Sequence, residues 1–365
     1  MEELHAEADE PHIKIVRPSS RRKFLTAILG SGVILGLGSP PLIHLAQNLQ
    51  VAFNAKAAPS AADLDFYSCS ADLNLAALTK SDHDGKLYIW NYQQQRMITL
   101  SATPLWNTSA WSFNGQYLFY QESQGDNSVS MYVWDIQTRQ KVSSYANEKY
   151  GEADLVCWAP DGSKIALLSR DQNKLLLLAA QPLWPLFTLE LPSAVGTFAW
   201  SPDSQKLAFI ISTPEQSAWS VQIWDLQSRR KSQEIAFQGH PNSYNSQLAW
   251  SPDGNRIAAW GGGQLQIIQT KNTSSSYLLT ESDHGKMCWS PNGKYLAVID
   301  ASDFMDFWTA SLGSRFNVWD ITQQKTIHSF NRGTAYVPEA LGWSRDGKHI
   351  VVIGTFYAQE NWDWM

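Results

Sequence analysis

The sequence is poor in cysteine and in charged residues. Its 365 residues include only Cys69, Cys157 and Cys288, with no CxxC or Cys/His spacing typical of zinc sites. An odd number gives no disulfide framework, and each cysteine lies in an apolar, strand-like run, so we expect buried free thiols. Charged residues make up 17%, the net charge is −6, and no basic stripe is present. This composition excludes nucleic-acid binding.

Fingerprints of common enzyme classes are also missing. The chain has no Gly-x-Ser-x-Gly, no P-loop and no dinucleotide-binding motif. Residues 82–84 and 283–285 superficially resemble metal ligands, but both fall in turns, where Asp and Gly are expected. Asp300, Asp303 and Asp306 lack the arrangement of a calcium loop. We therefore assign no catalytic, cofactor or metal residue and expect the chain not to be an enzyme.

Tryptophan, in contrast, is abundant, with 17 residues. Many of them begin a repeated string, Trp-Ser-Pro-Asp-Gly. We call the tryptophans that begin it anchors; they are Trp111, Trp158, Trp200, Trp250, Trp289 and Trp343. Stepping back 42 residues from Trp111 reaches Cys69-Ser70-Ala71-Asp72, a copy without its Trp and Gly. The copies indicate seven units between about residues 64 and 365, with a period of about 43 residues.

Each unit has the pattern of short strands joined by turns. In one unit, Gln247–Trp250, Arg256–Trp260 and Gln264–Ile268 alternate with turn residues, and a fourth strand follows near Tyr277–Leu279. Pro presets φ, Asp bonds locally and Gly tolerates positive φ in the turn at 251–254. The pattern predicts an all-β protein.

The third strand of several units ends in Trp-Asp, as at Trp134-Asp135, Trp224-Asp225 and Trp319-Asp320. This feature resembles the WD-repeat β-propeller, and the Trp-Ser-Pro-Asp-Gly string is similar to the Tol-system propeller repeat. The resemblance covers about 300 residues and implies a seven-bladed β-propeller of four-stranded antiparallel blades over 64–365. Eleven tryptophans would then pack between blades, namely the six anchors with Trp90, Trp134, Trp224, Trp319 and Trp362.

The N-terminal segment has the features of an export signal. Arg21 and Arg22 precede Phe24 and Leu25, and no Asp, Glu, Lys or Arg occurs from Phe24 to Ala55. The motif resembles the bacterial twin-arginine signal, which implies an extracytoplasmic protein that uses the twin-arginine export machinery. We expect a signal or membrane-anchor helix over 1–45 and a linker over 46–63.

Closure of the ring remains open between two arrangements. Leu49–Phe53 is the nearest strand-like segment that could complete the last unit. If the signal is retained as a membrane anchor, this strand is available. If it is cleaved after Ala57, residues 58–63 would have to close the ring.

Function would lie on the loops that follow the second and fourth strands. Their aromatic and acidic residues form the candidate partner-binding set, which comprises Trp106, Tyr150, Trp219, Tyr244, Phe304, Asp306, Trp308 and Tyr336. These side chains either bind a protein, peptide or glycan or pack over the mouth of the ring. We therefore expect a non-catalytic binding scaffold. The alternative is an extracytoplasmic propeller enzyme, such as a glycan lyase or hydrolase, with carboxylates at the central channel.

Overall fold

The computed structural model contains only β-strands as regular elements in its described part. It describes residues 31–35, 64–69, 75–80, 86–91, 96–101, 109–123, 128–147, 153–169, 173–213, 218–237, 246–261, 264–271, 277–281, 285–300, 314–332, 336–343, 347 and 350–356. In these ranges no helix is long and apolar enough to cross a membrane.

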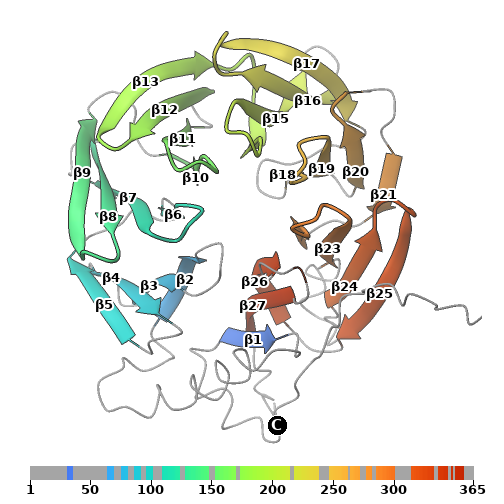
Figure 1. Ribbon diagram of the computed structural model, residues 1–365, viewed down its shortest axis with the longest axis horizontal. Helices are drawn as coiled ribbons and strands as arrows, with labels where there is room; N and C mark the ends of the chain where they lie inside the picture. Colours follow the sequence, from blue (N-terminus) through green and yellow to red (C-terminus); the bar gives the residue numbers. More distant parts are fainter. Residues whose placement is uncertain are drawn as a thin grey trace, which may run out of the picture.

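Six four-stranded antiparallel sheets, here numbered blades 1 to 6, follow one another around a ring (Figure 1). Blade 1 contains β2 (Leu64–Cys69), β3 (Leu75–Lys80), β4 (Lys86–Asn91) and β5 (Arg96–Ser101). Blade 2 contains β6 (Ala110–Trp111), β7 (Tyr117–Ser123), β8 (Val129–Asp135) and β9 (Gln140–Asn147). Blade 3 contains β10 (Leu155–Trp158), β11 (Lys164–Ser169), β12 (Lys174–Ala180) and β13 (Leu183–Glu190).

The remaining sheets complete the ring. Blade 4 contains β14 (Val195–Trp200), β15 (Lys206–Thr213), β16 (Ala218–Asp225) and β17 (Arg230–Phe237). Blade 5 contains β18 (Gln247–Trp250), β19 (Arg256–Gly261), β20 (Gln264–Gln269) and β21 (Tyr277–Glu281). Blade 6 contains β22 (Gly285–Trp289), β23 (Tyr295–Asp300), β24 (Ser314–Asp320) and β25 (Lys325–Arg332). The last sheet contains β26 (Tyr336–Trp343), β27 (Ile350–Phe356) and β1 (Ser31–Leu35).

Within each of blades 1 to 6 the strands lie in chain order, from the innermost to the outermost (Figure 1). The all-β propeller expected from the repeat is confirmed. The register also confirms the degenerate first copy: Cys69 pairs with Ala76, seven residues on, as the anchor Trp158 pairs with Ile165. Cys69 therefore occupies the anchor position of blade 1.

The last sheet differs from the others in its third strand. β1 lies beside β27, with Ser31 opposite Thr355 and Leu35 opposite Val351. The part of the export-like segment that the structure describes is therefore a strand, and the helix expected over 1–45 is not seen in it. The strand expected at 49–53 and the segment 58–63 lie outside the described residues.

Five of the six anchor tryptophans join two blades through a hydrogen bond, whereas the indole N–H of Trp111 has no hydrogen-bond partner among the described residues. In each of the five, the indole N–H donates to the carbonyl oxygen of the residue that precedes the anchor of the previous blade. The five bonds are Trp158 to Ala110 at 2.9 Å, Trp200 to Cys157 at 3.1 Å, Trp250 to Ala199 at 3.3 Å, Trp289 to Ala249 at 3.0 Å and Trp343 to Cys288 at 3.1 Å. Because these groups are largely buried, each bond satisfies two polar atoms that would otherwise be costly.

A flat side chain from the previous blade also covers several of the anchor rings. Tyr117 stacks on Trp158 with ring centroids 6.1 Å apart, and Tyr295 stacks on Trp343 at 6.3 Å. In blade 5 an arginine takes this position: the Arg256 guanidinium lies 5.3 Å from the Trp289 ring. Stacking and cation–π contacts of this kind contribute about 0.5–1.5 kcal/mol each.

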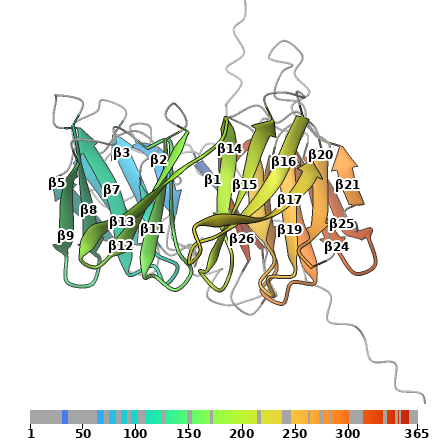
Figure 2. The same cartoon turned by 90° about the horizontal axis from the view of Figure 1, so that it is seen from above.

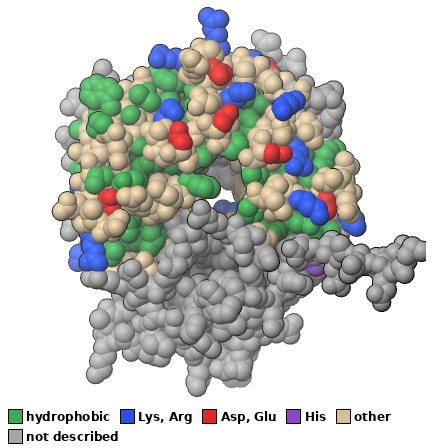
Figure 3. All heavy atoms as spheres, viewed as in Figure 1, with side chains coloured by type: hydrophobic (Ala, Val, Ile, Leu, Met, Phe, Trp, Pro, Cys, Tyr) green, Lys and Arg blue, Asp and Glu red, His purple; other side chains and the backbone are tan. Residues whose placement is uncertain are grey.

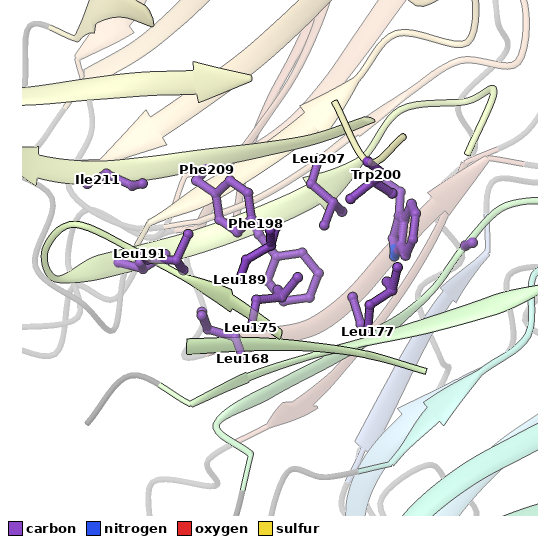
Figure 4. Close-up of a cluster of buried hydrophobic side chains, with 14 residues drawn as sticks. Leu168, Leu175, Leu177, Leu189, Leu191, Phe198, Trp200, Leu207, Phe209 and Ile211 are labelled. Carbon is purple, nitrogen blue, oxygen red and sulfur yellow. The ribbon is translucent and has the colours of Figure 1, made fainter. Parts of the chain in front are cut away.

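The core consists of apolar clusters between neighbouring blades. Figure 4 shows the cluster between blades 3 and 4, where Phe198 and Phe209 pack 6.1 Å apart beside Trp200 and leucines of β11, β12 and β13. Burying one side chain of this size contributes about 1.5–3 kcal/mol. Five anchors are buried and Trp250 is half-buried, as the packing role predicted.

The Trp-Ser-Pro-Asp-Gly turn has a fixed hydrogen-bond pattern. In blade 5 the Ser251 hydroxyl lies 2.5 Å from Asp253 Oδ1 and accepts the backbone N–H of Arg256 at 2.9 Å. Asp253 Oδ1 also accepts the Asn255 N–H at 3.0 Å. Gly254 has a φ of +69°, which disfavours any residue with a Cβ. The turn chemistry read from the sequence is therefore confirmed.

Two of these glycines differ in what surrounds them. A Cβ on Gly254 would lie 3.4 Å from Pro202 of the preceding turn, whereas a Cβ on Gly162 would meet nothing within 4 Å. Gly162 has a similar φ of +72°. We expect Gly162→Ala to cost about 1 kcal/mol of unfolding free energy, from φ alone. Gly254→Ala should cost about the same, because 3.4 Å is an ordinary van der Waals contact and the positive φ is the shared penalty.

Urea denaturation of both variants beside the wild-type protein measures the loss of unfolding free energy for each. Equal stability of the wild type and Gly162→Ala would show that positive φ does not explain the glycine in this turn.

Candidate binding surfaces

The ring has two chemically different ends. The turns between first and second strands and between third and fourth strands gather at one end, the lower side of Figure 2. We call this the turn end. The connections after the second and fourth strands leave from the opposite end, which we call the loop end.

The carboxylates of the turn end serve as turn caps. Asp135 Oδ1 accepts the backbone N–H groups of Gln137 at 2.8 Å and Thr138 at 2.9 Å. Asp225 and Asp320 make the corresponding bonds after β16 and β24. The Asp of these three Trp-Asp pairs is thus explained by the turn that follows the third strand.

The pKa directions agree with this capping role. Burial alone would raise the pKa of Asp253, but hydrogen bonds from Ser251 and Asn255 and the charge of Arg256 outweigh it and lower the pKa. The same balance lowers the pKa of Asp161 and Asp135. A general acid needs a raised pKa, so these carboxylates are poorly suited to acid catalysis. Figure 3, which views the turn end, shows acidic and basic side chains distributed around the ring.

Two cysteines line up at one position of the repeat, immediately before an anchor. Cys288 is partly buried, but Cys157 is exposed, which corrects the expectation that all the thiols are buried. The reason is its place on β10, an innermost strand that borders the central opening (Figures 1 and 3). Protein atoms still surround the sulfur closely enough that desolvation raises the pKa of Cys157 to about 11. The thiol is therefore protonated at neutral pH and is a poor nucleophile.

Most of the candidate partner-binding residues lie outside the described residues. These are Trp106, Tyr150, Tyr244, Phe304, Asp306 and Trp308, and the same holds for Arg21, Arg22, Phe24 and Leu25 of the export motif. The structure describes only Trp219 and the backbone of Tyr336.

Both of these residues were expected at loop tips, and the structure places them in strands. Trp219 belongs to β16, opposite Ser212 and Phe237. β16 begins at Ala218, so Trp219 is part of the strand and not of a loop. Its half-buried ring packs against the apolar cluster between blades 4 and 5. Tyr336 begins β26 and pairs with Phe356. The structure does not bring these two residues into one site.

An exposed tryptophan lies on the outer wall, outside the set of predicted site residues. Trp184, on the outermost strand β13, is 64% exposed, and Leu186 on the same strand is 42% exposed. The signal in the sequence is the run Leu-Trp-Pro-Leu-Phe at 183–187, which is apolar throughout although the fourth strand of a blade faces solvent on its outer edge. We call Val142, Tyr145, Trp184, Leu186, Phe187 and Arg229 the outer-wall patch.

A polar cluster lies on β16 and β17 of blade 4. Glu234 of β17 accepts hydrogen bonds from Ser220 Oγ at 3.0 Å and Gln222 Nε2 at 3.2 Å, and it pairs with the Lys231 ammonium. The donor Lys231, followed by Ser220 and Gln222, lowers the pKa of Glu234. Across the described ranges no group of three or more His, Cys, Asp and Glu side chains could hold a metal ion.

A known protein family matches the part of the chain that forms the blades. Residues 70–303, more than half of the chain, match the model of the TolB β-propeller domain. The chain belongs to the TolB β-propeller family. Of the two resemblances seen in the repeat, the match supports the Tol-system one.

Solved structures share the fold of this TolB-type propeller. Hydrazine synthase of Kuenenia stuttgartiensis matches with a TM-score of 0.55 and 17% identity, over 82% of this chain and 95% of that one. The dihydro-heme d1 dehydrogenase NirN, solved in complex with DHE, matches with a TM-score of 0.58 and 17% identity, over 81% of this chain. The TolB-type chain spans 62% of that protein's length. At this identity the likeness shows the fold alone.

The lowered pKa of Glu234 in the polar cluster makes the stability of the fold depend on pH. Because the folded pKa of Glu234 lies below its unfolded value, its stabilisation is complete above the unfolded pKa of about 4.3 and is lost as the pH falls through the folded pKa. We expect Glu234→Gln to lower Tm at pH 7, and the gap to the wild-type protein to close as the pH falls toward 3.

Differential scanning calorimetry across this pH range measures the gap. Glu190→Gln, which breaks the exposed pair with Lys174 at 3.5 Å, is the control and should change Tm little. A gap for Glu234→Gln that is constant with pH would contradict the assignment.

Proposed function

We propose that this TolB-type propeller is a non-catalytic, exported scaffold that binds a protein or polymer through its loop end. The observation that carries the proposal is the difference between the two ends. The turn end is built from one short turn used repeatedly, with its carboxylates engaged as caps such as Asp135 and Asp253. Chemical variety is left to the loop end, where the sequence places Trp106, Phe304 and Trp308.

The proposed location is extracytoplasmic. Support comes from the twin-arginine-like motif at Arg21 and Arg22, followed by a long segment without Asp, Glu, Lys or Arg. The proposed partners are therefore the export machinery during transit, and a protein, peptide or glycan afterwards. If the N-terminal segment is uncleaved, it would also attach the propeller to the membrane.

An enzymatic function is the second candidate, because both similar structures carry the names of enzymes, hydrazine synthase and a dehydrogenase. An enzyme of the glycan lyase or hydrolase type would need two carboxylates within about 10 Å at the central channel, one with a raised pKa. The carboxylates of the described residues with shifted pKa values are all shifted downward, which supports the binding scaffold instead.

A pull-down from envelope extracts tests the proposal. We expect Phe304→Ala/Trp308→Ala to lower the recovery of the partner at least tenfold, because the variant removes two aromatic anchors from the loop end. Phe113→Ala is the matched control, since Phe113 is 67% exposed in a first-to-second-strand turn at the opposite end. Quantitative mass spectrometry of the eluted proteins measures the recovery.

Unchanged recovery with the double variant, or an equal loss with Phe113→Ala, would contradict binding at the loop end. Fractionation of the same cells tests the location. The Arg21→Lys/Arg22→Lys variant should stay in the cytoplasm, whereas export of this variant would contradict the twin-arginine route.

A further inference from the structure

The outer strands of the blades differ in how they meet solvent. Lys141 lies on β9, Arg230 and Lys231 begin β17, and Lys325 begins β25. Charged residues of this kind commonly protect exposed strand edges from other chains. β13 has no cation and instead exposes Trp184 and Leu186. This is the surface composition of an interface rather than of a protected edge.

The exposed side chains sit on a rigid support formed by two blades. The Trp184 ring meets Tyr145 of β9 edge to face, with centroids 6.4 Å apart. The backbone N–H of Leu183 donates to Ser143 Oγ of β9 at 2.6 Å. Val142, which is 44% exposed, extends the apolar surface onto β9. Hydrophobic side chains gather at this part of the rim, at the upper left of Figure 3.

The backbone of β13 favours contact through side chains and not through an added strand. Pro185 has no N–H to donate to a new strand. The register between β12 and β13 also shifts here, because Leu177 pairs with Phe187 and Leu178 with Pro185. Leu186 is the extra residue of the resulting bulge, and bulges disrupt the ladder of hydrogen bonds locally.

One margin of the patch is positively charged. The Arg229 guanidinium lies 4.4 Å from the centre of the Phe187 ring. Arg229 is exposed, and among the described residues no carboxylate forms an ion pair with it. Arg230 follows it and is also exposed. A stacked guanidinium keeps its hydrogen-bond donors in one plane, which suits a carboxylate bound by two bonds.

We propose that the outer-wall patch docks a peptide segment of another protein, one that carries an aromatic or aliphatic side chain beside a carboxylate. The apolar side chain would pack on Trp184 and Leu186, and the carboxylate would pair with Arg229. Charge complementarity selects an acidic segment, because the exposed margin of the patch is basic. The proposal rests on the protein being a binding scaffold, but it names a surface separate from the loop end.

The test uses a random twelve-residue peptide library displayed on phage and selected on the purified full-length protein. We expect the enriched peptides to combine aromatic or aliphatic residues with Asp or Glu. Fluorescence anisotropy with a fluorescein-labelled enriched peptide then measures affinity. Trp184→Ser/Leu186→Ser and, separately, Arg229→Glu should each weaken binding at least tenfold. Arg229→Lys should keep part of the affinity, because it retains the charge without the planar donors.

Phe113→Ser and Phe304→Ala/Trp308→Ala are the matched controls and should bind the peptide as the wild type does. Thermal unfolding checks each variant for folding, and the single exposed Arg229→Glu keeps the test valid if the double variant does not fold. If the loop variant loses its envelope partners and the patch variants keep them, the proposed function holds. That outcome does not depend on whether the patch binds the peptide.

Four results would overturn the proposal. One is equal affinity of the enriched peptides for the wild type and the Trp184→Ser/Leu186→Ser variant. Another is enrichment of basic peptides. Binding to phosphatidylcholine–phosphatidylglycerol vesicles that the double variant loses would assign the patch to a lipid surface. A dimer in sedimentation velocity that the double variant abolishes would assign it to a second copy of this chain.

Discussion

The ring depends on the anchor tryptophans, because each one packs in the wedge between two blades and the five from Trp158 to Trp343 also donate their indole N–H to the blade before them. Trp200 shows both roles, with its ring in the cluster between blades 3 and 4 and its N–H 3.1 Å from the Cys157 carbonyl oxygen. Neither role suffices alone. Apolar packing is not directional, whereas the hydrogen bond requires one specific orientation of the neighbouring blade. Together they hold successive sheets in the same relative position.

The remaining features of the repeat follow from this constraint. The anchor lies at the end of the first strand, so the turn that follows it must be tight. The Ser251–Asp253 pair and the positive φ of Gly254 produce that turn, and Pro202 of the preceding turn lies close to the side on which a Cβ of Gly254 would stand. The opposite end of each strand has no such requirement. The fold therefore separates a structural end from an end where sequence can vary.

Sequence reasoning succeeded where a residue type has one structural use. The anchors, the turns and the degenerate copy at Cys69 were predicted because Trp, Pro, Asp and Gly recur in a fixed order. Ser204, which stands in place of Gly, still has a φ of +59° and accepts the Asp161 N–H at 3.0 Å. The turn thus tolerates a substitution that makes a new bond to the neighbouring turn.

The surface was harder to predict, because exposure depends on where strands begin and on which strand is outermost. Trp219 was placed in a loop, but β16 starts one residue before it. Trp184 was left unassigned, although it lies on an outermost strand that exposes its ring. An aromatic residue in a short strand gives the same sequence pattern whether its ring is buried or exposed. Only the position of the strand in the blade distinguishes a packing ring from an exposed one.

The claim that interblade indole bonds hold the ring is tested most directly by comparing two Trp→Phe variants in equilibrium urea unfolding. Trp200 donates across the interface to Cys157, whereas Trp224, which packs against the same cluster, donates within its own blade to Gln222 Oε1 at 3.2 Å. Trp200→Phe leaves a carbonyl of the neighbouring blade unpaired, which costs about 1–3 kcal/mol. We predict that this variant loses at least about 1 kcal/mol more unfolding free energy than Trp224→Phe, because the fixed backbone carbonyl cannot turn toward another donor whereas the Gln222 side chain can rotate. Equal losses, or a larger loss for Trp224→Phe, would contradict the account.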